Sequence, residues 1–90
     1  MEKERAIINF IICRKDGKME EVDLEIPLFI TANELVVALN SAYHLGIDVN
    51  DIKNCYLKAE NPIALLRGNK LLSDYGLMNG TRLCFFEGEN

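Results

Sequence analysis

The sequence predicts an α+β domain in which a mixed sheet of four to five strands wraps around one helix. Near the N-terminus, an isoleucine-rich segment and a second segment that alternates apolar and acidic residues both fit the period of two expected of strands. One capped segment with helical spacing follows, and then several short apolar segments separated by turn residues. The 90 residues are expected to form one domain, residues 1–90, with one modest core.

The first two strands are expected at residues 6–14 and 20–26, paired as a hairpin. Between them, Asp16-Gly17 predicts a two-residue loop whose twist suits antiparallel strands. Pro27 is expected to end the pairing, because proline has no backbone N–H to donate. Alternation turns six apolar side chains toward the core: Ile8, Phe10, Ile12, Val22, Leu24 and Ile26.

The only long helix is expected to begin at Thr31, because Thr31 and Glu34 have the spacing of a capping box. A length of about fifteen residues would bring its end to Gly46, since glycine readily adopts the left-handed conformation found after helices. His44 would then lie in the last turn, where a ring donor or a cation complements the free carbonyl groups. The predicted apolar stripe consists of Leu35, Val36, Leu39, Ala42 and Tyr43.

Short strands are expected at residues 54–60 and 63–67, on either side of Asn61-Pro62, and a final strand at residues 81–87. The side chains expected to face inward are Leu57, Ala59, Leu83 and Phe85. The resulting order of hairpin, helix, short strands, tight turn and final strand is that of the β-grasp fold. Packing the helix stripe against the strands covers every apolar face at once.

Composition and charge exclude several classes of protein. An apolar fraction of 49% and a charged fraction of 27% fit an ordinary globular domain. The net charge of −4 argues against binding to a nucleic-acid backbone, so a protein partner is expected. No segment approaches the roughly 20 apolar residues that span a bilayer. Residues 1–5 also lack the features of a secretion signal, so a cytoplasmic location is expected.

No catalytic residue, cofactor or metal site is expected. Cys13, Cys55 and Cys84 contain no CxxC pair, which favours reduced thiols that serve as small packing residues. One histidine cannot form a zinc site with three scattered cysteines. Residues 48–51 are similar to the start of a calcium loop, but Ile52 and Lys53 stand where such a loop needs a ligand and a glycine.

The most informative motif lies in residues 68–77, where Leu72-Ser73-Asp74-Tyr75 follows Gly68, and Asn79-Gly80 comes just before the final strand. This segment resembles the region of ubiquitin in which a similar turn leads into the last core strand. As a turn, Ser73 and Asp74 would cap backbone amides, and the Tyr75 hydroxyl would bond to the local chain. The resemblance implies a ubiquitin-like β-grasp fold.

The chain is also similar to the bacterial YukD/EsaB family, small ubiquitin-like proteins associated with type VII secretion systems. The similarity rests on the size of the chain and on three motifs, which are Ala59-Glu60-Asn61-Pro62, Gly68 with Leu72-Ser73-Asp74, and Asn79-Gly80. It implies a non-catalytic, cytosolic accessory or regulator of a machine that exports small helical WXG-type proteins. Neither the partner within that machine nor the oligomeric state follows from the sequence.

Two other functions stay open: a ubiquitin-like modifier or sulfur carrier, and a regulatory ubiquitin-like domain of a signalling protein. A modifier needs a thin, flexible carboxyl tail that an activating enzyme can adenylate, and two terminal glycines supply that. This sequence ends in Phe86-Glu87-Gly88-Glu89-Asn90, with one glycine followed by polar residues. Conjugation through this end is therefore not expected.

Ubiquitin's main docking surface is an apolar patch on its sheet, and the resemblance lets its positions be compared. Lys58 falls at the place of the patch's central isoleucine, Cys84 at that of its histidine and Phe86 at that of its valine. Receptors for the ubiquitin patch are therefore not expected to bind this chain. Alternation turns Arg82, Cys84 and Phe86 outward, so an exposed Phe86 beside Lys58 and Arg82 is the candidate protein-binding site. The alternative is that Phe86 only covers the sheet edge.

Overall fold

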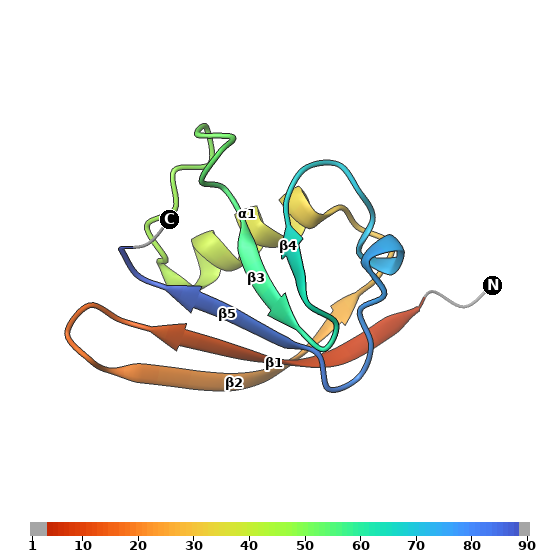
Figure 1. The fold of residues 1–90 in the computed structure, drawn as a ribbon, viewed down its shortest axis with the longest axis horizontal. Helices are drawn as coiled ribbons and strands as arrows, with labels where there is room; N and C mark the ends of the chain where they lie inside the picture. The colour runs from red at the N-terminus through yellow and green to blue at the C-terminus, as the bar shows by residue number, and fades with distance from the viewer. Residues whose placement is uncertain (1–3, 89–90) are drawn as a thin grey trace.

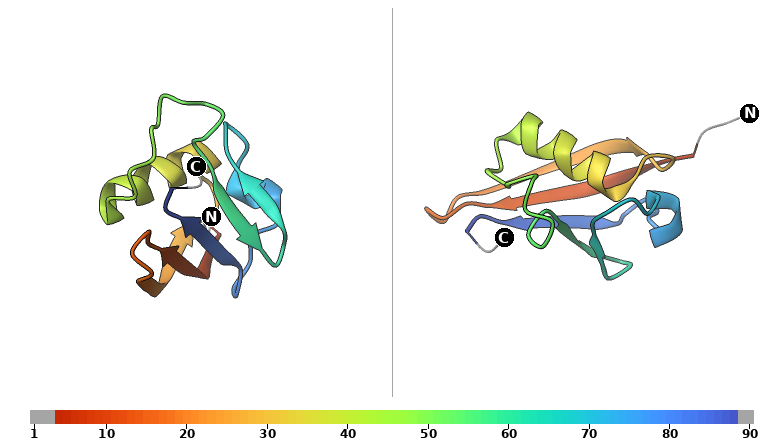
Figure 2. Two further views of the ribbon diagram at one scale, coloured as in Figure 1. Left: turned by 60° about the vertical axis from the view of Figure 1, so that its left-hand side comes forward. Right: turned by 90° about the horizontal axis from the view of Figure 1, so that it is seen from above.

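The computed structural model describes residues 4–88, in which five strands form one mixed sheet with one α-helix beside it (Figure 1). In chain order the elements are β1 (Arg5–Cys13), β2 (Met19–Pro27), α1 (Ala32–Tyr43), β3 (Leu57–Glu60), β4 (Ala64–Leu66), the 3₁₀ helix η1 (Leu72–Tyr75) and β5 (Arg82–Phe86). The strands lie side by side in the order β2-β1-β5-β3-β4. This is the predicted α+β class, and α1 runs along one face of the sheet (Figure 2).

The hairpin of β1 and β2 is confirmed, but its loop differs from the prediction. The N–H of Arg14 donates to the carbonyl of Lys18 at 2.8 Å, so the last hydrogen-bonded pair of the hairpin encloses three residues, 15–17, instead of two. In such a loop the last residue adopts the left-handed conformation, and Gly17 does so with a φ of 89°. Asp16-Gly17 therefore predicts the position of the turn correctly. The length of the loop is set by the pairing of Arg14 with Lys18.

Pro27 does not end the pairing, contrary to the prediction. It is the last residue of β2, opposite Arg5, and beyond it the N–H of Leu28 still donates to the carbonyl of Glu4 at 2.9 Å. Because hydrogen-bonded pairs alternate along an antiparallel ladder, the backbone of Pro27 faces away from β1. The missing N–H therefore removes no bond from the sheet.

The capping box predicted at the start of α1 is confirmed. The hydroxyl of Thr31 accepts from the N–H of Glu34 at 3.1 Å, and the Glu34 carboxylate accepts from the N–H of Thr31 at 2.9 Å. The helix has 12 residues, shorter than the predicted length of about fifteen. It ends at His44 instead of Gly46, because His44 itself adopts the left-handed conformation, with a φ of 54°.

The guanidinium of Arg14 occupies the place at the helix C-terminus that the sequence had assigned to His44. Its Nη2 donates to the carbonyl of Tyr43 at 2.9 Å, and its Nη1 donates to the carbonyl of His44 at 3.3 Å. The tip of the hairpin is thereby joined to the end of α1. Of the predicted apolar stripe, Ala42 is exposed, so the prediction is wrong at that position. The other members do pack on the core: Leu35, Val36, Leu39 and Tyr43.

β5 lies at the centre of the sheet, parallel to β1 and antiparallel to β3. The inward positions predicted for the strands are confirmed, since all of the following pack in one core: Ile8, Phe10, Ile12, Val22, Leu24, Ile26, Leu57, Ala59, Leu83 and Phe85. The last three strands are shorter than the predicted segments 54–60, 63–67 and 81–87. Several residues outside the strands and α1 complete the core, and the alternation pattern did not predict them: Leu28, Leu45, Ile47, Leu72 and Leu77.

Candidate functional site

The candidate site lies on the outer sheet face, which is the face opposite the core. Strand pairing places five side chains of this face in one row across all five strands: Leu65, Lys58, Cys84, Ile11 and Glu21. A second, neighbouring row runs through Phe86, Cys13 and Met19. The two rows together form a mainly apolar surface that contains one cation, Lys58, and one acid, Glu21 at its β2 end.

The predicted neighbours Phe86 and Lys58 do meet on this face. The Lys58 ammonium lies 5.5 Å from the centroid of the Phe86 ring, within the range of a cation–π contact. Phe86 itself is half-buried, so the prediction of an exposed ring is met only in part. The part of the ring that remains exposed forms an aromatic surface beside the Lys58 cation. Protein-binding sites commonly contain such aromatic surfaces.

Arg82 is exposed, as predicted, but it belongs to the rim of the surface. Its Nη1 lies 3.4 Å from Oε1 of Glu60, directly opposite on β3. Both side chains are more than half exposed, so this ion pair contributes little to stability. Arg82 is thus free to exchange Glu60 for an acidic group of a partner at small cost.

Cys84 points outward as alternation predicts, yet its side chain is only 8% exposed. It lies opposite Lys58 on β3 and Ile11 on β1, and these longer side chains cover it. Burial raises the pKa of the Cys84 thiol, and the nearby Glu60 carboxylate raises it further. The thiol therefore stays neutral, and with so little exposed area Cys84 mainly fills space beneath the surface.

The outer sheet face also includes three apolar residues that the sequence-based site did not: Ile11, Met19 and Leu65. The side chains of Met19 and Leu65 are 65% and 46% exposed. Met19 begins β2, and Leu65 is the middle residue of the three-residue strand β4, so neither stands in a clear alternating pattern. Ile11 lies between two core residues of an isoleucine-rich strand. The period of two along this strand turns Ile11 outward, and that was the signal that could have identified it.

The Leu72-Ser73-Asp74-Tyr75 segment forms the predicted turn. It forms η1, and the Tyr75 hydroxyl donates to the carbonyl of Arg67 at 2.9 Å, as predicted. No side-chain hydrogen bond caps η1, so the predicted capping by Ser73 and Asp74 is wrong. Backbone bonds hold this turn instead, including one from the N–H of Ser73 to the carbonyl of Leu28 at 3.0 Å.

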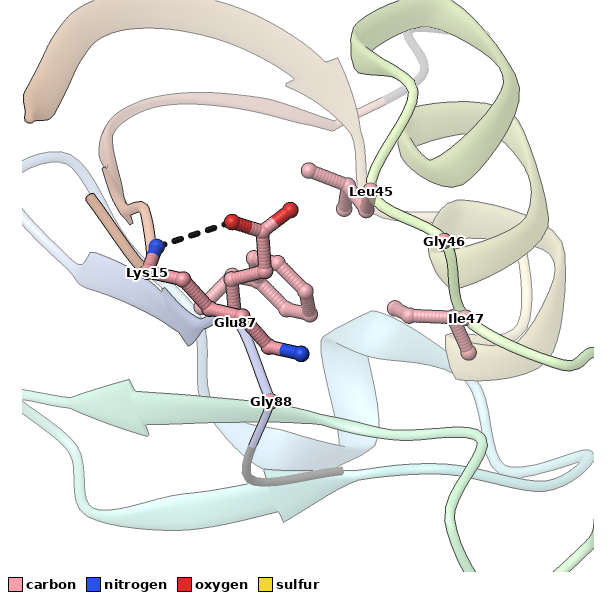
Figure 3. Close-up of a pocket in the computed structure, with 7 residues that line it drawn as sticks. Lys15, Leu45, Gly46, Ile47, Glu87 and Gly88 are labelled. Atoms are coloured by element: carbon pink, nitrogen blue, oxygen red, sulfur yellow. Dashed lines mark hydrogen bonds between the residues drawn. The ribbon is translucent and has the colours of Figure 1, made fainter.

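A pocket of about 230 Å³ opens where β5 ends (Figure 3). Leu45, Gly46 and Ile47 form one side, and Lys15 and Glu87 form the other. The Glu87 carboxylate accepts from the backbone N–H of Lys15 at 2.8 Å, and it also lies 3.8 Å from the Arg14 guanidinium. These bonds tie the end of β5 to the hairpin loop, and so fix the strand that carries Phe86.

Between residues 4 and 88, no group of three or more histidine, cysteine or acidic side chains is placed to hold a metal ion. Residues 48–51 form a loop in which Asp48 accepts from the N–H of Asn50 at 3.0 Å. Within the same residues, no helix is both long enough and apolar enough to cross a bilayer.

Comparison with solved structures shows a ubiquitin-like β-grasp fold. The ubiquitin-like domain of tubulin-binding cofactor B matches with a TM-score of 0.63 and 17% identity, covering 94% of this chain and 93% of that one. The C-terminal ubiquitin-like domain of mouse tubulin-specific chaperone e matches with a TM-score of 0.65 and 14% identity, covering 99% and 94%. A designed protein based on ubiquitin matches with a TM-score of 0.53 and 16% identity, covering 94% and 93%. No family model and no curated protein matches the sequence.

Proposed function

We propose that the chain is a non-catalytic, ubiquitin-like protein-interaction module that binds a protein partner through its outer sheet face. The observation that carries the proposal is the apolar surface on which Lys58 lies over Phe86. Exposed apolar side chains, Met19 and Leu65, extend this surface on both sides. An aromatic centre with a charged rim is the arrangement that protein interfaces favour.

The same face differs chemically from the patch that ubiquitin presents. Lys58 stands at its centre, and Glu60 and Arg82 form an ion pair on its rim. A partner therefore needs an apolar group for Phe86 and an acidic group within reach of Lys58. Receptors that require an isoleucine at the centre would meet the Lys58 ammonium there instead, and taking a charged group out of water is costly.

For the cellular role, we propose a cytoplasmic accessory or regulator of a type VII secretion system. The support is the resemblance of Ala59-Glu60-Asn61-Pro62, Leu72-Ser73-Asp74 and Asn79-Gly80 to the YukD/EsaB family. The partner on this proposal is a component of that system. Genes for WXG-type substrates and a membrane-bound ATPase beside the gene for this chain would support the assignment.

The binding proposal is tested by affinity capture from cells that produce the protein, followed by titration of the captured partner. Phe86→Ala and Lys58→Glu should each weaken binding about tenfold or more, because central aromatic residues and charges dominate interfaces. Ile52→Ala and Lys53→Glu are matched controls, since both residues are exposed and lie in a loop away from the sheet. If Phe86→Ala and Lys58→Glu retain full affinity, the outer sheet face is not the binding surface.

The modifier and sulfur-carrier functions are tested separately by intact-mass analysis. The protein is incubated with ATP and cell lysate, and the mass of every recovered species is measured. On our proposal the mass stays unchanged. A covalent adduct at the carboxyl end, whose residues 89 and 90 lie outside the described residues, would replace our proposal with conjugation.

A further inference from the structure

The sheet has one long open edge, and it is β2. The sheet order places β2 and β4 at the two edges, and β4 has only three residues while β2 has nine. An open edge presents a row of N–H and C=O groups that can pair with another chain. Short edge strands offer too few such groups, so β2 is the edge that can accept a strand.

Hydrogen bonds show which backbone groups of β2 are open. The bonds from Arg14 to Lys18 and from Leu28 to Glu4 fix the phase of the antiparallel ladder. Because hydrogen-bonded pairs alternate, the even-numbered residues of β2 bond to β1, and the odd-numbered residues turn their N–H and C=O outward. Glu21, Asp23 and Glu25 therefore each offer one donor and one acceptor at the open edge.

The side chains of these same three residues give the edge a strong charge. Alternation places Glu21, Asp23 and Glu25 on the outer face, and all three are exposed. Asp23 accepts from the Asn9 amide at 3.1 Å, and among the described residues no cation pairs with any of the three carboxylates. A strand added here would place its own outward side chains directly opposite three acids.

The inner face of β2 is apolar between these acids. Val22 and Leu24 pack against the core, but both are only partly buried, because β2 is the last strand of the sheet. An added strand would lay its inward side chains beside them. The pattern that fits both faces is therefore a basic residue at every second position with an apolar residue between.

We propose that the open edge of β2 binds an extended segment of a partner protein in which basic and apolar residues alternate. The backbone groups of Glu21, Asp23 and Glu25 supply the hydrogen bonds. Their carboxylates select the basic side chains, and Val22 and Leu24 receive the apolar ones. This contact borders the outer sheet face and shares Glu21 with its first row, but Phe86 lies two strands away in β5.

The same charges disfavour a second copy of this chain as the occupant. In an antiparallel pair of β2 edges, acids of one copy would stand opposite acids of the other, and like charges directly opposite destabilise a sheet. An acidic edge is a common protection against such pairing. A strand with basic side chains is instead attracted by the three acids. The edge therefore favours a basic segment over an acidic one, such as β2 of a second copy.

The test uses capped nine-residue peptides and the intact protein, followed by NMR of backbone amides. A peptide with alternating lysine and valine should bind with a Kd below about 1 mM, a weak affinity suited to a single strand. It should slow the hydrogen exchange of the amides of Glu21, Asp23 and Glu25. Two control peptides should bind at least about tenfold more weakly: one with alternating glutamate and valine, and one with the same lysines and valines in two blocks.

Two variants separate the backbone from the charge. Asp23→Pro removes an outward N–H and no ladder bond, so the sheet should persist in circular dichroism while peptide binding falls about tenfold or more. Asp23→Asn keeps the N–H and loses one charge, so affinity should fall only about twofold to fivefold. The inference is overturned if no peptide binds at 1 mM, if the glutamate peptide binds equally well, or if the shifted amides are those around Lys58 and Phe86. If Asp23→Pro unfolds, the test relies on the unaltered protein. There the peptide must slow the hydrogen exchange of the amides of Glu21, Asp23 and Glu25, and unchanged exchange overturns the inference.

Discussion

Replacing Arg14 with methionine should remove the contact between the hairpin and the end of α1, and so lower the stability of the domain. The guanidinium donates to the carbonyls of Tyr43 and His44, and its Nε lies 2.8 Å from Oε2 of Glu20. Only 19% of the Arg14 side chain is exposed. Methionine keeps much of the aliphatic volume and removes every one of these bonds, so the change isolates the charged group.

The expected cost follows from the individual contacts. A hydrogen bond from a charged donor contributes about 1.5 to 3 kcal/mol, and the longer bond at 3.3 Å falls at the low end. The Glu20 pair adds less than about 1 kcal/mol, because Glu20 is half exposed. We expect Arg14→Met to lower the free energy of unfolding by about 3 to 5 kcal/mol, a large part of the roughly 5 to 10 kcal/mol available to a domain of this size.

Urea denaturation followed by circular dichroism measures this change. Glu20→Gln is the matched control, since it removes the ion pair and leaves both carbonyl bonds in place, and it should cost less than about 1 kcal/mol. Arg14→Lys should fall between the two, because an ammonium cannot span two carbonyls and a carboxylate at once. A cost below about 0.5 kcal/mol for Arg14→Met, or an equal cost for Glu20→Gln, would refute the reasoning.

Three further changes test other parts of the molecule. Thr81→Val should cost about 2 kcal/mol and Thr81→Ser about 1 kcal/mol, because the buried hydroxyl accepts from the N–H of Met78 and donates to the carbonyl of Asn61; equal thermal shifts for the two would contradict this. Leu39→Ala should cost about 2 to 5 kcal/mol in urea denaturation, and a cost under 1 kcal/mol would place Leu39 outside the core. Burial raises the pKa of Cys55 and of Cys84 above the ordinary value of 9.0. An unfolded thiol therefore ionises first, so stability should fall as the pH rises past 9.0, and a Cys55→Ala, Cys84→Ala variant should lose that part of the pH dependence.

The sequence predicted correctly those features that depend on residues close together in the chain. The capping box at Thr31 and Glu34 depends on residues three apart, and the strand faces depend on a period of two. The loop of the hairpin was misjudged, because Asp16-Gly17 is compatible with a two-residue turn and also with the end of a three-residue one. The pairing of Arg14 with Lys18 decides between them, and that depends on the register of the whole hairpin.

Contacts between distant parts of the chain could not be predicted in the same way. Arg14 reaches a helix end 30 residues away, and the sequence offered His44 as the nearer candidate. For the candidate site, alternation gave the direction of Cys84 and Phe86 but not their burial. Burial depends on which side chains of neighbouring strands stand beside them, here Lys58 and Ile11, and so on the sheet order.

Phe86 and the β2 edge at Asp23 should contribute independently to the binding of any partner that contacts both. Phe86 and Asp23 lie on strands separated by β1, and two strand spacings amount to about 10 Å. The two sites also use different groups, an aromatic ring in one and backbone N–H and C=O groups in the other. We therefore expect the binding losses of Phe86→Ala and Asp23→Pro to add within about 0.5 kcal/mol in a double-mutant cycle. A larger coupling would mean that one segment of the partner contacts both sites, so that displacing it from the edge also removes it from Phe86.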